Sequence, residues 1–116
     1  MRINYQILVE MKHSSIIEAK YLYLNEKTLT GHIVMEHCDF PDLRKFMNQN
    51  KKKKLGEGLV ASIVYEMLDC LAYLEDKGVC HKDIKPENIL YDEVSGKIKL
   101  IDFDIAEMQR YKHEKL

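Results

Sequence analysis

One short segment of this sequence concentrates side chains that could do chemistry. Residues 81–88 read His-Lys-Asp-Ile-Lys-Pro-Glu-Asn, which places five ionisable side chains and one amide within eight residues. A second acid, Asp102, follows an apolar stretch fourteen residues beyond Asn88. Carboxylate and amide oxygens are hard ligands that suit Mg²⁺ and a polyphosphate. Lys85, two residues after Asp83, would hold a phosphate oxygen as a compact point charge.

The surrounding sequence predicts a rigid scaffold for these side chains. Residues 58–77 form the clearest helix, because their apolar residues recur at i, i+3, i+4 spacing, and Gly78 caps its C-terminal end. Two short strands at 89–91 and 98–101 follow, joined by a turn at 93–96. Loops at strand ends are where rigid scaffolds hold reactive groups. The apolar stripe of the helix consists of Val60, Ile63, Val64, Met67, Leu68, Leu71 and Leu74.

Upstream, the pattern predicts a helix, a hairpin and a second helix. Residues 2–12 have apolar side chains at helical spacing, and strands over 16–24 and 29–35 flank a turn at 25–27. Asp42 is placed to cap a helix with Leu43, Phe46 and Met47 on its inner face. Four consecutive lysines at 51–54 are interpreted as a solvated loop rather than a nuclear-localisation or anionic-partner patch.

Composition narrows the class of protein. The 116 residues are 46% hydrophobic and 32% charged with a net charge of −1, which argues against a general role on nucleic acid or a membrane surface. The start does not resemble a signal peptide, and no stretch approaches the roughly 20 apolar residues of a membrane span. Cys38, Cys70 and Cys80 are widely spaced and odd in number, which favours reduced thiols. We expect a cytoplasmic protein, with the nucleus as the alternative.

The chemistry-bearing segment resembles the catalytic loop of eukaryotic-type protein kinases, His-Arg-Asp with Asn five residues after the Asp. Here it reads His81-Lys82-Asp83 and Asn88, and the later segment, Asp102-Phe103-Asp104, resembles the Asp-Phe-Gly motif. The sequence of residues 85–88, Lys-Pro-Glu-Asn, is similar to that of the serine/threonine branch of the family.

The resemblance implies a role for each motif residue. Asp83 would accept the proton of the substrate hydroxyl, and Lys85 would lie beside the transferring phosphate. Asn88 and Asp102 would hold the Mg²⁺ ions that bridge the phosphates of ATP. The implied cofactors are therefore ATP and Mg²⁺.

The resemblance also implies an adenine pocket. Residues 34–38 look like a strand that runs into the kinase hinge, where the Glu36 carbonyl and the Cys38 N–H would bond adenine. Met35 would line the back of the pocket and Leu90 its floor. His81 and Phe103 would stack with Leu8 as an apolar spine, and ordinary core packing would account for these positions equally well.

The implied fold is α+β: a fragment of the bilobal kinase fold with a hairpin and hinge, two lower-lobe helices, the catalytic loop and a second hairpin. Residues 1–116 would be a partial kinase domain, with 1–36 a remnant of the upper lobe and 37–116 the hinge and the start of the lower lobe. The glycine-rich loop and the phosphate-gripping lysine are missing, and Asn4 stands near the position of the regulatory-helix glutamate. Lys82 replaces arginine, and Asp104 replaces glycine.

Two functional hypotheses follow. The first is phosphoryl transfer from ATP to serine or threonine of a protein substrate in the parent fold, which this truncated chain would lack on its own. The second is an inactive kinase-derived fragment that binds and modulates a partner kinase through apolar faces left exposed, on the order of several hundred Å².

Overall fold

The computed structural model describes residues 2–50, 55–103 and 106–108, and the side chains among them from residue 6 onward. The elements in chain order are α1 (Arg2–Glu10), β1 (Ala19–Asn25), β2 (Thr30–Met35), α2 (Leu43–Gln49), α3 (Glu57–Asp76), β3 (Val79–Cys80), the 3-10 turn η1 (Pro86–Asn88), β4 (Ile89–Asp92), β5 (Lys97–Leu100) and β6 (Glu107–Met108). This mixture of helices and small antiparallel sheets confirms the α+β class. No helix within these ranges is long and apolar enough to cross a membrane.

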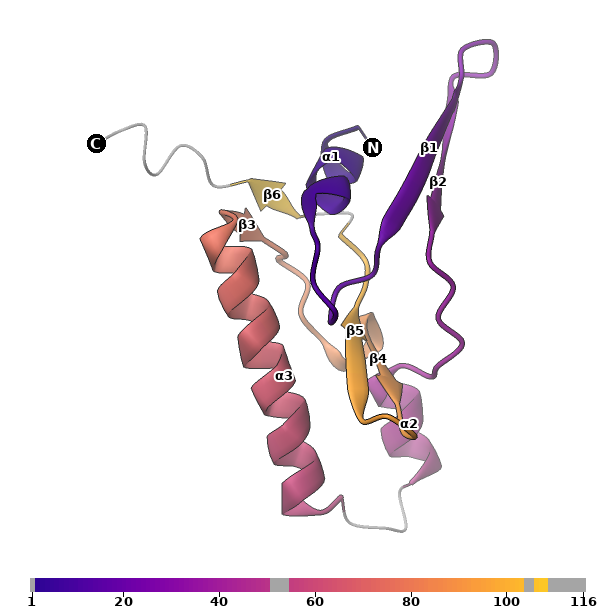
Figure 1. Ribbon diagram of the computed structural model, residues 1–116. Helices are drawn as coiled ribbons and strands as arrows, with labels where there is room; N and C mark the ends of the chain where they lie inside the picture. The colour runs from indigo at the N-terminus through magenta and orange to yellow at the C-terminus, as the bar shows by residue number, and fades with distance from the viewer. Residues whose placement is uncertain (1, 51–54, 104–105, 109–116) are drawn as a thin grey trace, which may run out of the picture.

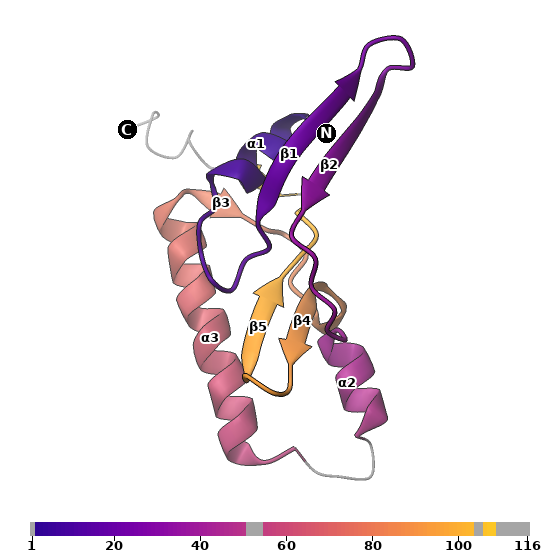
Figure 2. The same ribbon diagram turned by 45° about the vertical axis from the view of Figure 1, so that its right-hand side comes forward.

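The hairpin of β4 and β5, called the central hairpin below, lies between α3 and α2 (Figures 1 and 2). Its register pairs Ile89 with Leu100 and Asp92 with Lys97. Upstream segments extend both of its edges. Ile17 N donates to Leu100 O at 3.1 Å beside β5, and Tyr91 N donates to Pro41 O at 2.9 Å beside β4. The predicted hairpin over 16–24 and 29–35 begins later than expected, at Ala19, because residues 15–17 bond to β5 instead.

The predicted helix boundaries are confirmed closely, and their caps explain them. Asp42 Oδ1 accepts from Lys45 N at 2.8 Å, which satisfies a free amide of the first turn of α2. Phe46 is buried on the inner face of α2 and meets Tyr91 edge-on, with ring centroids 4.8 Å apart. Gly78, which follows the C-cap residue Lys77 of α3, has φ +71°, a conformation that glycine adopts without a Cβ penalty.

The apolar stripe predicted for α3 divides into two faces. Ile63, Met67 and Leu74 pack on the core, together with Cys70, which the stripe omitted and which is fully buried. Burial raises the pKa of the Cys70 thiol to about 11, so this residue is an inert core group. The rest of the stripe is exposed in the structure: Val60, Val64, Leu68 and Leu71.

Two short strands have no counterpart among the elements predicted from the sequence. They are β3 and β6, which pair with each other, with Cys80 opposite Glu107. Strands of two residues are too short to show the alternation of apolar and polar residues by which a strand is recognised in a sequence.

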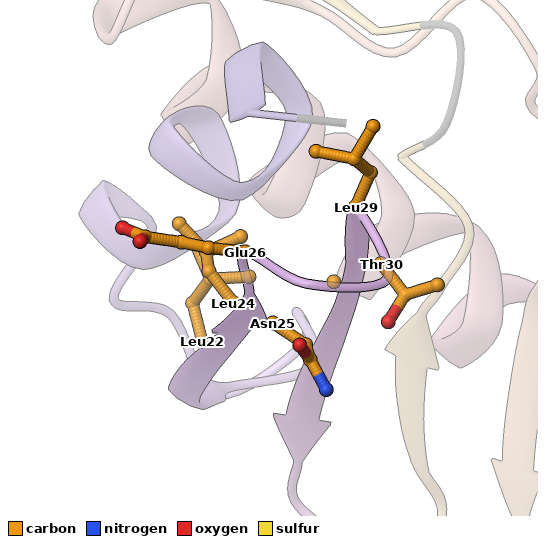
Figure 3. A pocket seen from close by; sticks show the side chains of 7 residues that line it. Leu22, Leu24, Asn25, Glu26, Leu29 and Thr30 are labelled. Carbon is orange, nitrogen blue, oxygen red and sulfur yellow. The ribbon is translucent and has the colours of Figure 1, made fainter.

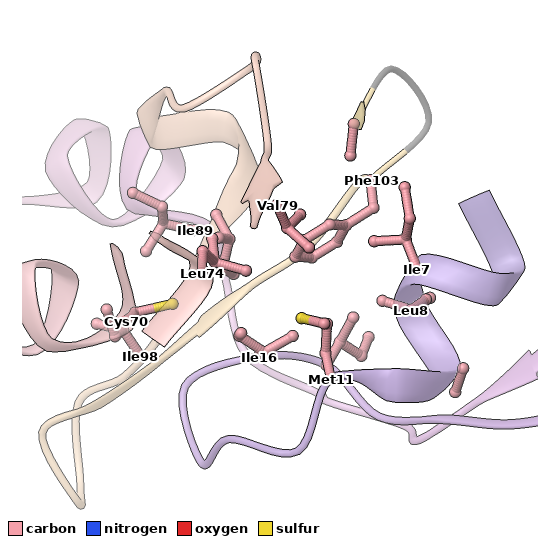
Figure 4. Packing of buried hydrophobic residues seen from close by; sticks show 14 of the residues in the cluster. Ile7, Leu8, Met11, Ile16, Cys70, Leu74, Val79, Ile89, Ile98 and Phe103 are labelled. Carbon is pink, nitrogen blue, oxygen red and sulfur yellow. The ribbon is translucent and has the colours of Figure 1, made fainter. Parts of the chain in front are cut away.

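The hydrophobic core lies between α1, α3 and the β4–β5 hairpin, where Ile7, Leu74 and Phe103 pack together (Figure 4).

Glu66 joins α3 to the central hairpin. Its Oε2 accepts from Ile98 N at 3.1 Å, and Ile98 is buried. We predict that Glu66→Ala lowers the free energy of unfolding by about 1–3 kcal/mol, because the amide loses its partner away from water. Glu66→Gln keeps an acceptor oxygen and should retain most of the stability in a urea titration. Equal losses in both variants would contradict this assignment.

Candidate active site

His81 fixes the start of the loop that carries the candidate catalytic residues. Its ring Nε2 lies 2.9 Å from Ile101 O, and its Nδ1 lies 3.1 Å from Asp83 N. A carbonyl only accepts and a backbone amide only donates, so Nε2 carries the proton and Nδ1 accepts. The ring meets Phe103 edge-on at 4.7 Å between centroids. This stacking agrees with the expected spine, and Leu8 is buried in the same apolar cluster.

Asn88 closes the loop onto Asp83. Its Nδ2 donates to Asp83 O at 2.9 Å and to Asp83 Oδ2 at 3.1 Å. The Asn88 side chain is buried, with 5% of the residue exposed, so these bonds hold the Asp83 carboxylate in one orientation. The amide nitrogen of Asn88 is thus engaged with Asp83, and Oδ1 is the atom of this side chain that could ligate a cation.

Lys85 supplies the positive charge nearest to Asp83. Its Nζ lies 3.5 Å from Asp83 Oδ1, and the two side chains are 49% and 31% exposed. An ion pair this open contributes little to stability. Its positive charge is therefore available to an anionic group that approaches Asp83.

The central hairpin brings Asp102 to the same place. Ile101 N donates to Asn88 O at 2.9 Å, one step beyond the Ile89–Leu100 pair. Asp102 therefore follows directly on the residue that is bonded to Asn88. The two residues predicted as metal ligands thus meet at one end of the hairpin although they are fourteen positions apart.

The backbone is strained on both sides of this site. Lys82 has φ +71° and Asp102 has φ +61°, which are left-handed conformations that cost a non-glycine residue on the order of 1 kcal/mol or more. Such strain persists where the surroundings impose it and is concentrated at functional sites. Here the His81 and Asn88 bonds impose it from either side.

The donor set at this end fits Mg²⁺. Asn88 Oδ1 and the Asp102 carboxylate are hard oxygen donors, and Mg²⁺ is commonly held by one or two carboxylates with water and substrate phosphates. No group of three or more His, Cys, Asp or Glu side chains suited to a metal occurs in the described part of the chain. The site therefore suits an ion shared with a phosphate ligand better than one enclosed by protein.

The segment between β2 and α2 holds two of the residues predicted to bind adenine, Glu36 and Cys38. Glu36 N donates to Glu18 O at 2.9 Å, and Glu36 Oε1 accepts from Glu18 N at 2.9 Å and from Lys99 Nζ at 2.8 Å. Burial pushes the pKa of the Glu36 carboxyl upward, but the bonds from Lys99 and Glu18 outweigh it and hold that pKa below its usual value. Burial, and secondarily the negative Glu36, raise the pKa of the half-buried Cys38 thiol.

The other two predicted adenine contacts differ in exposure. Leu90 is half-buried on β4 and forms a backbone bridge with Asp42, which brings it beside the segment after Cys38. Met35 is 44% exposed at the end of β2. A separate cavity of about 300 Å³ lies at the tip of the β1–β2 hairpin, where Leu29 is 91% exposed, and contains none of the predicted site residues (Figure 3).

Of the two residues that differ from the kinase motifs, Lys82 and Asp104, the structure describes Lys82. Lys82 Nζ lies 3.0 Å from Glu107 Oε1, across the β3–β6 pair. The sequence did not reveal this contact, because an isolated glutamate in a polar stretch carries no signal. Asp104, the lysines at 51–54 and the side chain of Asn4 lie outside the described residues.

Comparison with known proteins identifies the family of the chain. A family model described as protein kinase domain matches residues 1–115. The chain is 35% identical over 104 residues to calcium-dependent protein kinase 6 of Plasmodium berghei (strain Anka), which covers 88% of this chain and 7% of that protein. It is 35% identical over 103 residues to a protein of Dictyostelium discoideum named Probable serine/threonine-protein kinase, covering 81% of this chain and 8% of that protein. A third relative, MAP3K epsilon protein kinase 1 of Arabidopsis thaliana, is 35% identical over 100 residues, covering 86% of this chain and 7% of that protein.

The chain spans less than a tenth of the length of these relatives. The family match extends over nearly all of the present sequence and includes the His81 loop and Asp102. The chain belongs to the protein kinase domain family.

Proposed function

We propose that this chain carries the phosphoryl-transfer centre of a serine/threonine protein kinase, which moves the γ-phosphate of ATP to a serine or threonine hydroxyl of a protein. The observation that carries the proposal is the bond between Asn88 and Asp83 at the end of the hairpin where Asp102 lies. This arrangement sets a proton acceptor beside two oxygen donors for Mg²⁺.

Asp83 orients the nucleophile. Its Oδ2 is held by Asn88, so the carboxylate is fixed before the substrate arrives. The hydroxyl oxygen forms a bond to the γ-phosphorus as the bond to the bridging oxygen of ADP breaks, and the hydroxyl proton passes to Asp83. Catalysis of this kind depends on position and charge, so an ordinary carboxylate is sufficient.

Lys85 and the two metal ligands act on the phosphates. The Lys85 ammonium, 3.5 Å from Asp83, is placed to turn from that carboxylate to an oxygen of the transferring group. Asn88 and Asp102 would hold Mg²⁺, which would supply positive charge to the phosphates of ATP. Loss of either ligand would leave the nucleotide without this neutralisation.

The adenine end of ATP is assigned to the segment after β2. Glu36 C=O and Cys38 N–H bond the base edge, Met35 lies behind it, and Leu90 lies below it. In this assignment residues 1–36 contribute the upper lobe, and residues 37–116 contribute the hinge and the lower lobe. The hydrogen bonds that fix Glu36 to Glu18 support the assignment, because they hold the Glu36 main chain in place.

Nucleotide binding by the purified protein tests the proposal. With Mg²⁺ present, ATP at 100 times its Kd should stabilise the wild type by about 2.7 kcal/mol in thermal unfolding. Asp102→Asn should abolish most of the Mg²⁺-dependent part, because a neutral amide attracts the cation far less than a carboxylate. Glu93→Gln, in the exposed turn of the same hairpin, is the matched control. Phosphate transfer to tyrosine peptides but not to serine or threonine peptides would refute the assigned substrate class.

A second candidate function is supported by the exposed row on α3. Val60, Val64 and Leu68 lie on its outer face, beside Tyr65, which is 73% exposed. Apolar rows of this kind mark contact sites. In this alternative the chain transfers no phosphate and binds another kinase chain through α3. Turnover that Asp83→Ala abolishes would refute it.

A further inference from the structure

A charged bridge lies behind the segment that joins β2 to α2, apart from the residues that face the phosphates. Lys99 Nζ and Glu36 Oε1 are 2.8 Å apart, and their side chains are 23% and 24% exposed. The two residues are 63 positions apart in the sequence. The bridge therefore ties the residue that follows β2 to the middle of β5.

Glu36 is held by three bonds at once. Its backbone N donates to Glu18 O, while its Oε1 accepts both from Glu18 N and from Lys99 Nζ. The backbone bond from Glu36 N to Glu18 O continues the β1–β2 ladder by one step beyond the Ala19–Met35 pair, whereas Glu18 N bonds to the Glu36 side chain. Together the three bonds restrict both the backbone and the side chain of Glu36, and thereby set the direction of its carbonyl.

Lys99 lies on β5, the strand that pairs with the strand of Leu90, β4. In the register of the central hairpin, Lys99 stands directly opposite Leu90. Cross-strand partners lie on the same face of a sheet, so both side chains extend toward the β2–α2 segment. The bond between Lys99 and Glu36 therefore fixes how far the β2–α2 segment lies from Leu90.

An ion pair, rather than packed apolar groups, sets this separation. A cavity of about 330 Å³ lies here, and Glu36, Lys99, Glu18 and Lys12 are among the residues that line it. Partial burial limits screening by water and salt, so this pair is stronger than the open ion pairs elsewhere on the surface. The pKa of the Glu36 carboxyl is lowered although burial raises it, which agrees with a persistent bond to Lys99.

We propose that Lys99 is a positioning residue for the nucleotide: its bond to Glu36 holds the carbonyl that meets the adenine edge at a fixed height above Leu90. This inference rests on the proposed function, since it assigns Glu36 C=O and Leu90 to the adenine pocket. Lys99 itself touches neither adenine nor phosphate in this arrangement. Its contribution is to keep the two sides of the pocket at the spacing that a purine fills.

The test compares binding of a non-hydrolysable ATP analogue with Mg²⁺ in four forms of the purified protein. Lys99→Met keeps the aliphatic stem and removes the charge, and should raise the Kd about fivefold. Lys99→Arg keeps the charge and the donor, and should restore most of the affinity. Lys97→Met, two residues along the same strand and paired with Glu66 at 3.9 Å, is the matched control and should leave the Kd unchanged.

A second measurement reports on the bridge without nucleotide. The unfolding temperature of Lys99→Met, Glu36→Gln and the double variant should show non-additive losses, because each change removes the same bond. Nucleotide binding by the wild type with an unchanged or lower Kd in Lys99→Met would overturn the inference and leave the proposed function intact. Absence of nucleotide binding by the wild type would overturn both, even where the unfolding data still detect the bridge.

Discussion

In the parent kinase fold, Asp83→Ala should lower the turnover number for phosphorylation of a serine or threonine peptide roughly 10²- to 10⁴-fold, the range typical of a lost general base. Binding of Mg·ATP should change little, because Asn88 keeps its bond to the Asp83 main-chain oxygen when the carboxylate is removed. The measurement is initial rates at saturating ATP, with nucleotide-dependent thermal unfolding of the same preparation. An effect on rate without an effect on binding separates a group that acts on the reacting hydroxyl from one that builds the pocket.

Two controls make this prediction specific. Asp83→Asn keeps the shape of the side chain and an oxygen that can face Asn88 Nδ2, so its fold should be intact while its turnover falls. Asp69→Ala removes an exposed acid that pairs with His13 at 3.0 Å, far along α3 from the loop, and should retain turnover. Turnover in Asp83→Ala within about tenfold of the wild type would contradict a role for this carboxylate in proton transfer.

Local signals predicted most of the secondary structure. The cap at Asp42, the glycine after α3 and the turn within the central hairpin each depend on a few neighbouring residues, so a single sequence displays them. The start of β1 was predicted too early. Ile16 is apolar like a strand residue, but it bridges to Leu100, and a contact with a residue so distant leaves no mark on local spacing.

The same distinction applies to the candidate site. The spacing of Asp83, Asn88 and Asp102 predicted that they belong together, and the hairpin register brings Asn88 and Asp102 to one end. Two other charged contacts of the candidate site were not predictable. Lys99 and Glu107 are ordinary charged residues in the sequence, and only the fold places them against Glu36 and Lys82.

The exposed row on α3 shows how a periodic pattern can be correct about an element and incomplete about its packing. The helix forms over nearly the predicted range, yet only part of its stripe meets the core. Helical spacing predicts which residues share a face of the helix. The width of the apolar face determines how many neighbouring elements are needed to bury it. Here the predicted stripe is broader than the surface that β5 and β3 cover.

Leu100 supports the central hairpin through both its side chain and its main chain. It is 0% exposed and pairs with Ile89, one step before Ile101 bonds to Asn88 of the candidate site. Its main chain also bonds the α1–β1 loop, since Leu100 N donates to Ser15 O at 2.7 Å and Leu100 O accepts from Ile17 N at 3.1 Å. A cavity at this position would loosen the strand that carries Asp102 and the loop that crosses it.

Leu100→Ala should lower the free energy of unfolding by about 3–5 kcal/mol, because a fully buried leucine loses its transfer energy and leaves a cavity. That loss is a large share of the roughly 5–15 kcal/mol that stabilises a typical domain, so the variant should be substantially unfolded near body temperature. Urea unfolding followed by circular dichroism measures it. Val94→Ala, where the side chain is 98% exposed in the turn of the same hairpin, should cost less than about 0.5 kcal/mol. Similar losses in the two variants would contradict the central place of Leu100 in the core.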